Sequence, residues 1–347
     1  MWTAVLVLML VANLLIFVHE LGHLLAAKWA GMPVTSFSVG FGPRLLSKKV
    51  GRTRYQLALI PLGGYVRIEG MRGTEKERRA WPTGFAFQPL YARMIVIAAG
   101  VTANVILAGL IYAVLALDGG AGPLEPRLMA IDAYAVRDAA GWEAVPLDRR
   151  IVAMGDNVLD DWADLGLAVL SAPEGFHDLK FEDGSVHRVW VPGDERSRII
   201  VLEALIPALP ELVDTDLRGA VQMGAREVKR NSRLIAESGK LLASGAIGLR
   251  QLSGPVEIAR IGTETLQMDL RPFLAFIAFL SLNLAILNFL PIPILDGGHF
   301  FLLVLEGLAG KPLPQSVYRY STVAGATVVG FFMIFAFLND ILRIFGI

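Results

Sequence analysis

The chain of 347 residues contains no cysteine and only five histidines. The absence of cysteine excludes disulfide bonds and every metal site built on thiolate ligands. Charged residues are also scarce: they make up 18% of the chain, whereas soluble domains carry about 25%. Hydrophobic residues make up 54% and are concentrated in a few long runs. This composition is typical of a membrane protein rather than of a soluble domain.

Four stretches are long and apolar enough to cross a bilayer, whose core needs about 20 mostly apolar helical residues. The first stretch has no basic residue ahead of it and contains histidine and glutamate, which is the reverse of a cleaved signal peptide. The third contains a break rich in proline and glycine. We therefore predict an α-helical polytopic membrane protein with about four transmembrane helices, at residues 1–27, 94–117, 272–305 and 321–347.

The charges of the connecting segments predict the orientation of the chain. Residues 28–93 contain 12 Lys and Arg against 3 acidic residues, whereas residues 118–271 contain 17 against 25. Basic residues near the ends of spans favour the cytoplasmic side of a membrane. We therefore expect residues 28–93 and the short loop 306–320 in the cytoplasm. The acidic region and both termini are expected on the outside.

A metal-binding pattern lies inside the first predicted span. Residues 19–23 read His-Glu-Leu-Gly-His, and both imidazoles can reach one ion because positions i and i+4 of a helix share a face. Glu20 lies about 60° round the helix from His23, close enough to take a proton from a water at the ion. The pattern predicts one zinc ion held by His19 and His23, with Glu20 as the catalytic base. The alternative is an interhelical hydrogen-bond cluster, although such polar residues are costly in a span.

The third zinc ligand should be another acid or histidine at membrane depth, because zinc in a hydrolase usually has three protein ligands and one open position. Two other acids lie in predicted spans, Asp296 and Asp340, and Asp340 is near the chain end. Asp296 lies between two prolines and two glycines, and broken backbone at this depth is tolerated where it is buried or lines a cavity. We predict Asp296 as the third ligand. The alternative role for Asp296 is a helix cap at a kink.

These residues resemble the site-2 protease family of intramembrane zinc metalloproteases, and the likeness covers nearly the whole chain. The HELGH sequence matches the zinc-binding motif of the family, and Leu295-Asp296-Gly297 matches its LDG motif. The resemblance implies His19, His23 and Asp296 as zinc ligands and Glu20 as the catalytic base. Within the family, the likeness is greatest to the bacterial branch that cleaves an anti-sigma factor, the regulator of sigma-E, in the envelope stress response.

Two further motifs of the family lie in other predicted spans. Gly100-Val-Thr-Ala-Asn104 matches GxxxN, and Asn288-Phe-Leu-Pro291-Ile-Pro293 matches NxxPxP. We expect these residues to contribute to substrate binding, with Asn104 stabilising an oxyanion or holding the substrate backbone, because an unpaired amide is costly at this depth. The small residues around Gly100 also predict close packing between helices, and both roles stay open.

The segment between the first two spans is expected to contain strands. Val34–Val39 and Arg54–Ile68 alternate enough to predict them, with glycines marking the turns. The resemblance implies a membrane-associated β-hairpin or small sheet near the active site. An extended substrate can add to the edge of such a sheet. The alternative is a loop with a purely structural role.

Residues 118–205 are expected to form one PDZ-like, β-rich domain outside the cytoplasm. Arg150–Trp162 resembles the strand, turn and continuation of a PDZ domain, and Leu179–Val191 predicts a hairpin with its turn at Asp183 and Gly184. Val145–Arg149 replaces the small and glycine residues of the family pattern, so we expect this domain to exclude bulky substrates rather than to capture a free carboxyl terminus. Residues 206–271 are expected to be amphipathic and interfacial, with a helix over Leu217–Leu252.

The function expected from these features is hydrolysis of a peptide bond within the transmembrane segment of a single-span membrane protein. An anti-sigma factor or remnant signal peptides would be the substrates in regulated intramembrane proteolysis, and zinc the single cofactor. Membrane lipid is the other expected partner, no nucleic-acid motif is present, and the resemblance implies a bacterial inner membrane. A non-proteolytic zinc carrier or a PDZ-type binding protein is the alternative, and the spore-development or sterol-regulatory branch of the family is a third interpretation.

Overall fold

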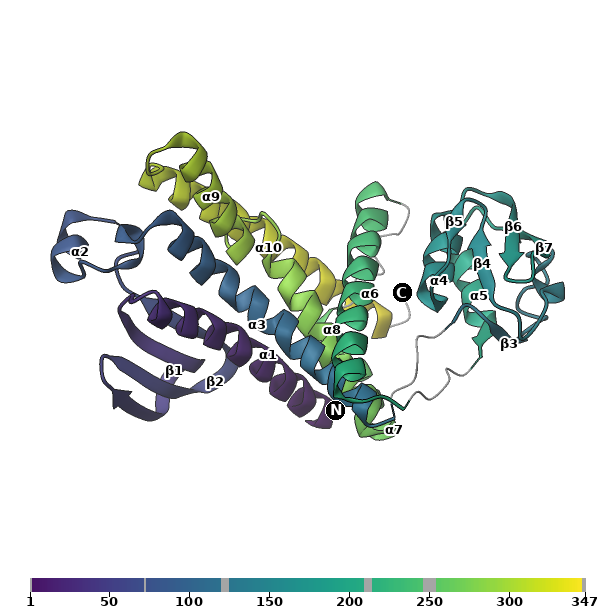
Figure 1. Ribbon diagram of the computed structural model, residues 1–347, viewed down its shortest axis with the longest axis horizontal. Helices are drawn as coiled ribbons and strands as arrows, with labels where there is room; N and C mark the ends of the chain where they lie inside the picture. The colour runs from purple at the N-terminus through teal and green to yellow at the C-terminus, as the bar shows by residue number, and fades with distance from the viewer. Residues whose placement is uncertain (1, 72, 120–124, 209–213, 246–253, 345–347) are drawn as a thin grey trace. The chain divides into compact units, whose positions relative to one another are not determined.

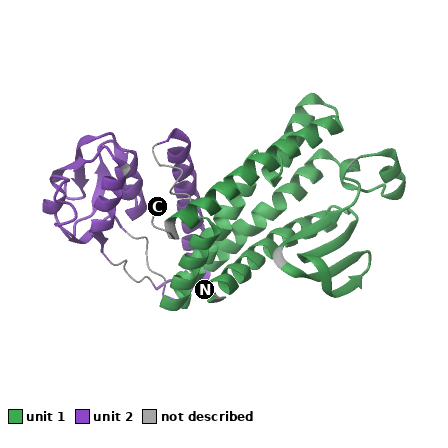
Figure 2. Cartoon of the chain, turned by 180° about the vertical axis from the view of Figure 1, so that it is seen from behind, with its two compact units in different colours: residues 1–112, 252–347 green, residues 113–251 purple. Residues whose placement is uncertain are grey.

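The computed structural model describes residues 2–71, 73–119, 125–208, 214–245 and 254–344 (Figure 1). The chain divides into two compact units, residues 1–112 with 252–347 and residues 113–251 (Figure 2). Among the described residues, four helices are long and apolar enough to cross a membrane. This number confirms the prediction from hydropathy. The four helices are α1 (Trp2–Trp29), α3 (Leu90–Leu117), α8 (Leu270–Asn288) and α10 (Gln315–Ile344).

The end of α1 shows how the sequence turns the chain from helix into sheet. Gly31 adopts a left-handed φ of 70°, which glycine alone adopts without steric cost. The backbone N–H groups of Gly31 and Met32 donate to the carbonyls of Lys28 and Ala27, and these bonds satisfy the last carbonyls of the helix. The next strand therefore begins at Val34 and runs back along α1.

A sheet of two long, bent strands, β1 (Val34–Val50) and β2 (Thr53–Ile68), lies beside α1 (Figure 1). The first part of β1, residues 34–39, pairs with two stretches of β2, residues 54–57 and residues 64–68. The second part of β1 pairs with the beginning of β2 up to the turn at Gly51. The strands expected at Val34–Val39 and Arg54–Ile68 are therefore present. Because both strands bend, each contributes two paired segments, and the sheet has four segments side by side.

Two apolar clusters join the helices of the first unit. One cluster combines Leu24 of α1, Phe37 of the sheet, Val96 of α3 and Leu303 of a later helix. The other combines Val7 and Val11 of α1 with α8 residues. The short helix α7 (Pro255–Met268) packs against both α1 and α8. These contacts hold α1 between the sheet and the other helices.

The third predicted span is two helices with a bend between them. Helix α8 ends at Asn288, and α9 (Asp296–Ala309) begins eight residues later. The structure corrects the predicted bounds of the loop 306–320. Helix α9 continues to Ala309, and α10 already begins at Gln315. The reason is that the charge of Glu306 does not mark a helix end: its side chain is 9% exposed and paired with Arg93.

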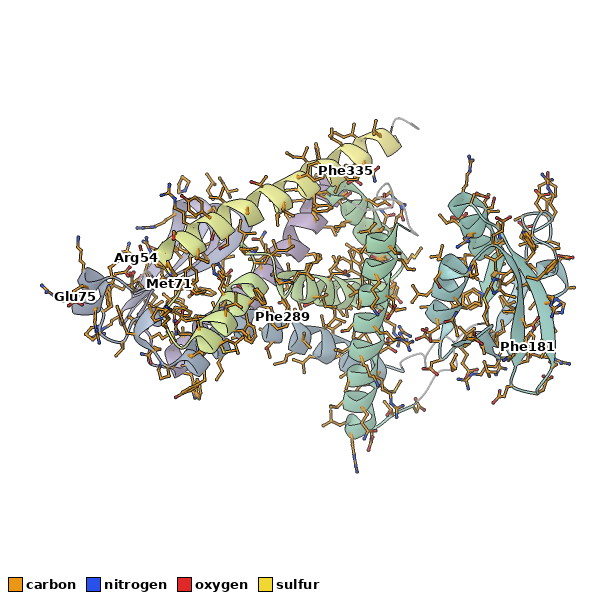
Figure 3. The ribbon with its side chains drawn as sticks, turned by 90° about the horizontal axis from the view of Figure 1, so that it is seen from above. Arg54, Met71, Glu75, Phe181, Phe289 and Phe335 are labelled. Carbon is orange, nitrogen blue, oxygen red and sulfur yellow. The ribbon has the colours of Figure 1, made fainter. Side chains whose placement is uncertain are left out.

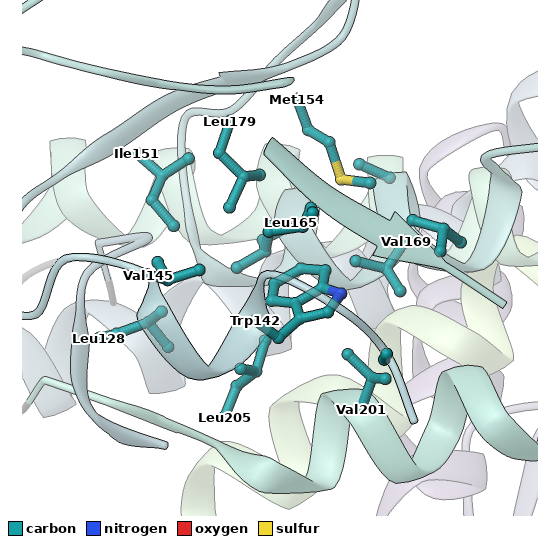
Figure 4. Packing of buried hydrophobic residues seen from close by; sticks show 14 of the residues in the cluster. Leu128, Trp142, Val145, Ile151, Met154, Leu165, Val169, Leu179, Val201 and Leu205 are labelled. Carbon is teal, nitrogen blue, oxygen red and sulfur yellow. The ribbon is translucent and has the colours of Figure 1, made fainter. Parts of the chain in front are cut away.

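The second unit contains a small body with its own core. A four-stranded sheet in the order β5-β4-β6-β7 is accompanied by a two-stranded sheet of β3 and β8. Trp142 is fully buried among the side chains of this core (Figure 4), and its Nε1 donates to the carbonyl of Trp190. The expected hairpin is present as β6 and β7, and the smaller sheet extends to Pro207. The elements are β3 (Leu128–Ile131), β4 (Ile151–Met154), β5 (Asn157–Val158), α4 (Trp162–Ser171), β6 (Gly175–Phe181), β7 (Val186–Val191), α5 (Glu195–Ala204) and β8 (Leu205–Pro207).

A long amphipathic helix, α6 (Leu217–Ser244), follows this body in the second unit. The side chain of Asp216 caps its first turn by accepting from the N–H of Gly219. Arg233 of α6 forms an ion pair with Asp164 of α4. The helix expected over Leu217–Leu252 is therefore present as far as Ser244, and residues 246–252 of that prediction lie outside the described residues.

Candidate metal centre

Three side chains predicted as zinc ligands meet at one point in the first unit. His19 and His23 lie one turn apart on α1, and Asp296 is the first residue of α9. Asp296 Oδ2 lies 3.0 Å from His19 Nε2 and 3.2 Å from His23 Nε2, and the two Nε2 atoms are 3.2 Å apart. Among the described residues, this is the one group of three or more acidic or histidine side chains arranged to hold a metal ion.

The hydrogen bond of His23 indicates which of its ring nitrogens is free. Its Nδ1 lies 2.8 Å from the backbone carbonyl of Val96, and a carbonyl can only accept, so Nδ1 carries the proton in the neutral ring. Nε2 of His23 then presents a lone pair toward Asp296 and cannot donate to it. The Nε2 lone pair of His23 and the carboxylate oxygen, 3.2 Å apart, repel one another unless a cation or a proton lies between them. The bond to Val96 is of the kind that orients a metal-binding histidine.

The spacing of the three atoms suits zinc. Zinc bonds to nitrogen and oxygen are about 2.0–2.2 Å long in tetrahedral sites, so neighbouring ligand atoms lie roughly 3.3–3.5 Å apart, a few tenths of an ångström more than the observed separations. Asp296 Oδ2 is buried and has no hydrogen-bond partner among the described residues, which is the state of an oxygen available to a metal ion. Two imidazoles and one carboxylate leave the fourth position open for water or substrate. The residues present therefore fit a catalytic zinc ion.

Glycines allow α3 to approach the metal group. A Cβ at Gly100 would lie 2.8 Å from His19 Nε2, and a Cβ at Gly22 would lie 2.9 Å from the Cβ of Ala103. Both distances are shorter than carbon atoms tolerate, so larger residues would force the two helices apart. The close packing predicted around Gly100 is thus present, and its contribution to substrate binding stays a prediction. Gly22 has a role that the sequence pattern did not reveal, because its partner is about 80 residues away along the chain.

Asn104 lies one turn beyond Gly100 on α3 and is completely buried. Neither atom of its side-chain amide has a hydrogen-bond partner among the described residues, while its backbone carbonyl accepts a 2.8 Å bond from Ser281 Oγ of α8. A buried amide without partners costs free energy. The amide is therefore free to bond a polar group that reaches it, and its role in substrate binding stays a prediction.

Glu20 lies between the metal group and the sheet. It follows His19 directly on α1, and a Cβ at Gly64 of β2 would lie 3.4 Å from Glu20 Cγ. A larger residue at position 64 would also lie 2.7 Å from the carbonyl oxygen of Ser38. The glycine therefore keeps the last part of β2 close to the predicted catalytic base.

The predicted residues Asn288, Pro291 and Pro293 lie at the bend between α8 and α9 and are not part of the metal group (Phe289 marks the bend in Figure 3). Proline lacks an N–H donor and interrupts a helix, so the two prolines end α8 and allow α9 to start at Asp296. Gly325 of α10 packs against the same bend, since a Cβ there would lie 2.8 Å from the backbone nitrogen of Ile294.

The second acid of the predicted spans, Asp340, has a different position and role. Its carboxylate accepts bonds of 2.9 Å and 2.8 Å from the N–H groups of Gly254 and Val256, and it is 3% exposed. These are unpaired donors at the beginning of α7, so Asp340 caps that helix.

Comparison with known proteins agrees with this geometry. The sequence profile described as Peptidase family M50 matches residues 5–336. A relative from Fusobacterium nucleatum is 31% identical, over 98% of this chain and 99% of its own length. Relatives from a Nostoc species (32% identical; 90% of this chain, 89% of the relative) and a Synechocystis species (29%; 96% and 93%) are similar over comparable lengths, and all three bear the name "Putative zinc metalloprotease". The chain belongs to peptidase family M50, the site-2 protease family.

Proposed function

We propose that this protein is an intramembrane zinc endopeptidase that cleaves the transmembrane segment of a single-span membrane protein. The observation that supports the proposal most strongly is that Asp296 meets His19 and His23, which lie on a helix long and apolar enough to span a bilayer. These three residues would hold the zinc ion. When bound, zinc lowers the pKa of a coordinated water and polarises a carbonyl group.

Glu20 acts as the general base and then as the general acid. It accepts the proton of the attacking water and returns that proton to the amine that leaves after peptide-bond cleavage. Its position beside Gly64 of β2 supports a substrate strand held next to this carboxylate. The unpartnered amide of Asn104 binds the carbonyl groups of the unwound substrate.

The last stretch of β2, residues 64–68, is an edge of the sheet that the substrate extends. Residues 34–39 lie on its inner side, so its outer side is available for strand addition. A transmembrane helix hides its peptide bonds in its own hydrogen bonds. Pairing with an edge strand offers new partners for those groups when the helix unwinds, and cleavage then falls within the bilayer.

The second unit acts as an outer, PDZ-like filter in this proposal. Its paired sheets and the helix α4 support a PDZ-like arrangement, and the basic segment 28–93 supports a cytoplasmic position for the β1–β2 sheet. Both termini and the PDZ-like body are then outside, in a bacterial inner membrane. Anti-sigma factors and remnant signal peptides, with small outer parts, are the substrates we propose for regulated intramembrane proteolysis.

The experiment that tests this function is co-expression with a panel of tagged single-span membrane proteins. Wild type is compared with Glu20→Gln, which retains the shape of the side chain, and with Asp296→Asn. We expect cleavage within the transmembrane segment by wild type alone, with both variants at least 1,000-fold slower. Cleavage by Glu20→Gln at a substantial rate would contradict its role as the base. A folded wild type that binds zinc but cleaves no member of a broad panel would instead favour a non-proteolytic zinc-binding protein.

A further inference from the structure

A basic cavity lies at the end of the β1–β2 sheet formed by the turn between the two strands. It has a volume of about 550 Å³ and is lined by Thr35, Lys49, Gly51, Arg52, Arg54 and Trp81. The three cations belong to 6 consecutive positions of the hairpin, 49–54. Arg54, labelled in Figure 3, is half-buried there. The metal group on α1 and α9 shares no residue with this cavity.

The positive charges of Lys49, Arg52 and Arg54 repel one another. Lys49 and Arg54 are direct cross-strand partners, and like charges placed opposite each other destabilise a sheet. Neither of them, nor Arg52, forms an ion pair or side-chain hydrogen bond with a described residue. The nearby acid Glu69 instead accepts a 2.6 Å bond from Thr35. The arrangement therefore favours an anion that comes from outside the chain.

The rest of the hairpin indicates where such an anion lies. Its other end carries exposed apolar side chains, with exposed fractions of 69% at Leu46 and 42% at its partner Leu57. The cross-strand pair Lys49–Arg54 is three residues further along, roughly 10 Å at 3.3 Å per residue. A hairpin whose apolar end enters lipid thus places these cations at the depth of the headgroups. Trp81 suits the same depth, since indole rings favour the membrane interface.

We propose that this cavity binds the phosphate group of an anionic phospholipid. Arginine presents a planar fork of donors that matches phosphate oxygens, and lysine adds a point charge. The exposed leucines of the same hairpin lie on the opposite face of the strands but place the sheet in lipid, so the cations meet the headgroups of the surrounding bilayer. A free phosphate would use the same cations but would not need a sheet whose apolar end lies in lipid. The site is separate from the proposed proteolytic activity and does not depend on it.

The test measures binding of short-chain lipids to the purified full-length protein in detergent. Dioctanoyl-phosphatidylglycerol is compared with dioctanoyl-phosphatidylcholine by native mass spectrometry and by the shift in unfolding temperature. The double variant Lys49→Ser/Arg54→Ser is compared with Arg44→Ser/Lys48→Ser, which removes the same charge from the same sheet outside the cavity. Lys48 is a matched control because neighbouring residues of a strand face opposite sides. Of the four replaced side chains, three are exposed and Arg54 is half-buried, so both double variants should fold. Equal unfolding temperatures of the two variants without lipid verify that they do.

We expect phosphatidylglycerol to bind at least tenfold more tightly than phosphatidylcholine. The cavity variant should lose at least tenfold in affinity for phosphatidylglycerol, the control variant less than twofold, and Lys49→Arg should retain most of the binding that Lys49→Ser loses. Equal losses in both double variants would show unspecific attraction and would overturn the site. Equal affinity for the two lipids would overturn it as well.

Two competitors identify the source of the anion. Glycerol 1-phosphate and inorganic phosphate carry the headgroup chemistry without acyl chains, and we expect them to compete at least 100-fold more weakly than the lipid. Competition at the same concentration as the lipid would overturn the lipid assignment in favour of a free phosphate. Displacement of the lipid by a poly-glutamate peptide at micromolar concentration would overturn it in favour of an acidic protein segment.

Discussion

Gly22 and Gly100 bring α1 and α3 together where the metal ligands lie. Neither residue supplies a ligand atom, but the space that each leaves is filled by the other helix: the backbone of Ala99 next to Gly22 and the two imidazoles next to Gly100. Protein interiors are close-packed, so one additional methyl group at such a position has to displace its neighbours. The positions of the imidazoles therefore depend on Gly100.

Replacement of Gly100 by alanine should weaken zinc binding. The added methyl group would lie 2.8 Å from His19 Nε2, and the ring would have to move from its ligand position. We expect zinc affinity to fall at least tenfold, measured by competition with a chelator. Gly330→Ala is the control, because a Cβ there meets nothing within 4 Å and helix propensity favours alanine. Unchanged affinity in Gly100→Ala would contradict the packing described for this site.

Asn104 should affect stability and activity in opposite directions. Leucine has a similar shape without the amide, so Asn104→Leu removes a buried group that has no partner among the described residues and should raise the free energy of unfolding by about 1 kcal/mol. The same variant should lose at least tenfold in kcat/KM if the amide binds substrate. Thermal unfolding and single-turnover cleavage measure the two effects. A variant that loses stability and retains its activity would show that the residue serves helix packing alone.

The sequence pattern singled out the residues whose proposed roles depend on side-chain chemistry. His19, Glu20 and His23 form a local pattern that a helix places on one side. Asp296 is recognisable because an acid beside a broken helix at membrane depth is costly unless the backbone there is buried or lines a cavity. Gly22 was not predicted, because its role depends on a backbone that packs against it from a distant segment. The role of Asp340 as a cap of α7 was not predicted for the same reason, because 84 residues separate it from its partner Val256.

At the scale of elements, a buried polar cluster connects three helices at the opposite end of α9 from Asp296. Glu306 of α9 pairs with Arg93 of α3 and accepts a 3.1 Å bond from the hydroxyl of Tyr318 on α10. The side chains of Arg93 and Glu306 are only 12% and 9% exposed. Arg93 lies two turns before Gly100 on α3, so the cluster fixes α9 relative to the helix that packs on the imidazoles.

Removal of one member of this cluster should destabilise the protein strongly. Arg93→Met leaves the carboxylate of Glu306 buried without its partner, and we expect a loss of about 3–5 kcal/mol. The double variant Arg93→Met/Glu306→Leu removes both charges and should recover at least half of that loss. Thermal unfolding of the detergent-purified proteins measures the difference. Additive losses in the double variant would contradict a paired, buried arrangement.

The elements themselves were predictable to different degrees. Apolar runs identified the four candidate spans, because length and hydropathy are sufficient for that purpose. The boundaries near residues 306–320 were not predictable, since hydropathy treats Glu306 as a sign of a loop while the structure pairs it inside. The sequence also did not predict that residues 34–39 pair with a segment on each side, because alternation of residues predicts a strand but not its partners.

At the scale of the whole molecule, each of the two units has its own core. In the second unit, the core around Trp142 is formed entirely by residues between Leu128 and Leu205. Leu128 pairs with Pro207 in the small sheet, so the chain enters and leaves this body at neighbouring points. A body with a separate core and adjacent ends is expected to fold without the remainder of the chain.

The excised segment 125–208 should therefore fold by itself. We expect a cooperative thermal transition and a well-dispersed amide spectrum from the isolated segment. Trp142→Ala should abolish both, because it empties the centre of the core. Val158→Ala is a suitable control, since this apolar side chain is 73% exposed. An isolated segment without a cooperative transition would contradict the separate core.

The measurement that tests the central claim most directly is the zinc content of three purified proteins: wild type, Glu20→Gln and Asp296→Asn. Elemental analysis after dialysis against a chelator of moderate affinity gives zinc per chain. The account predicts one zinc per chain in wild type and in Glu20→Gln, because Glu20 handles protons and binds no metal. It predicts a clear loss in Asp296→Asn, which lacks the third ligand. Full zinc in Asp296→Asn, or loss of zinc in Glu20→Gln, would contradict the assignment of the metal centre.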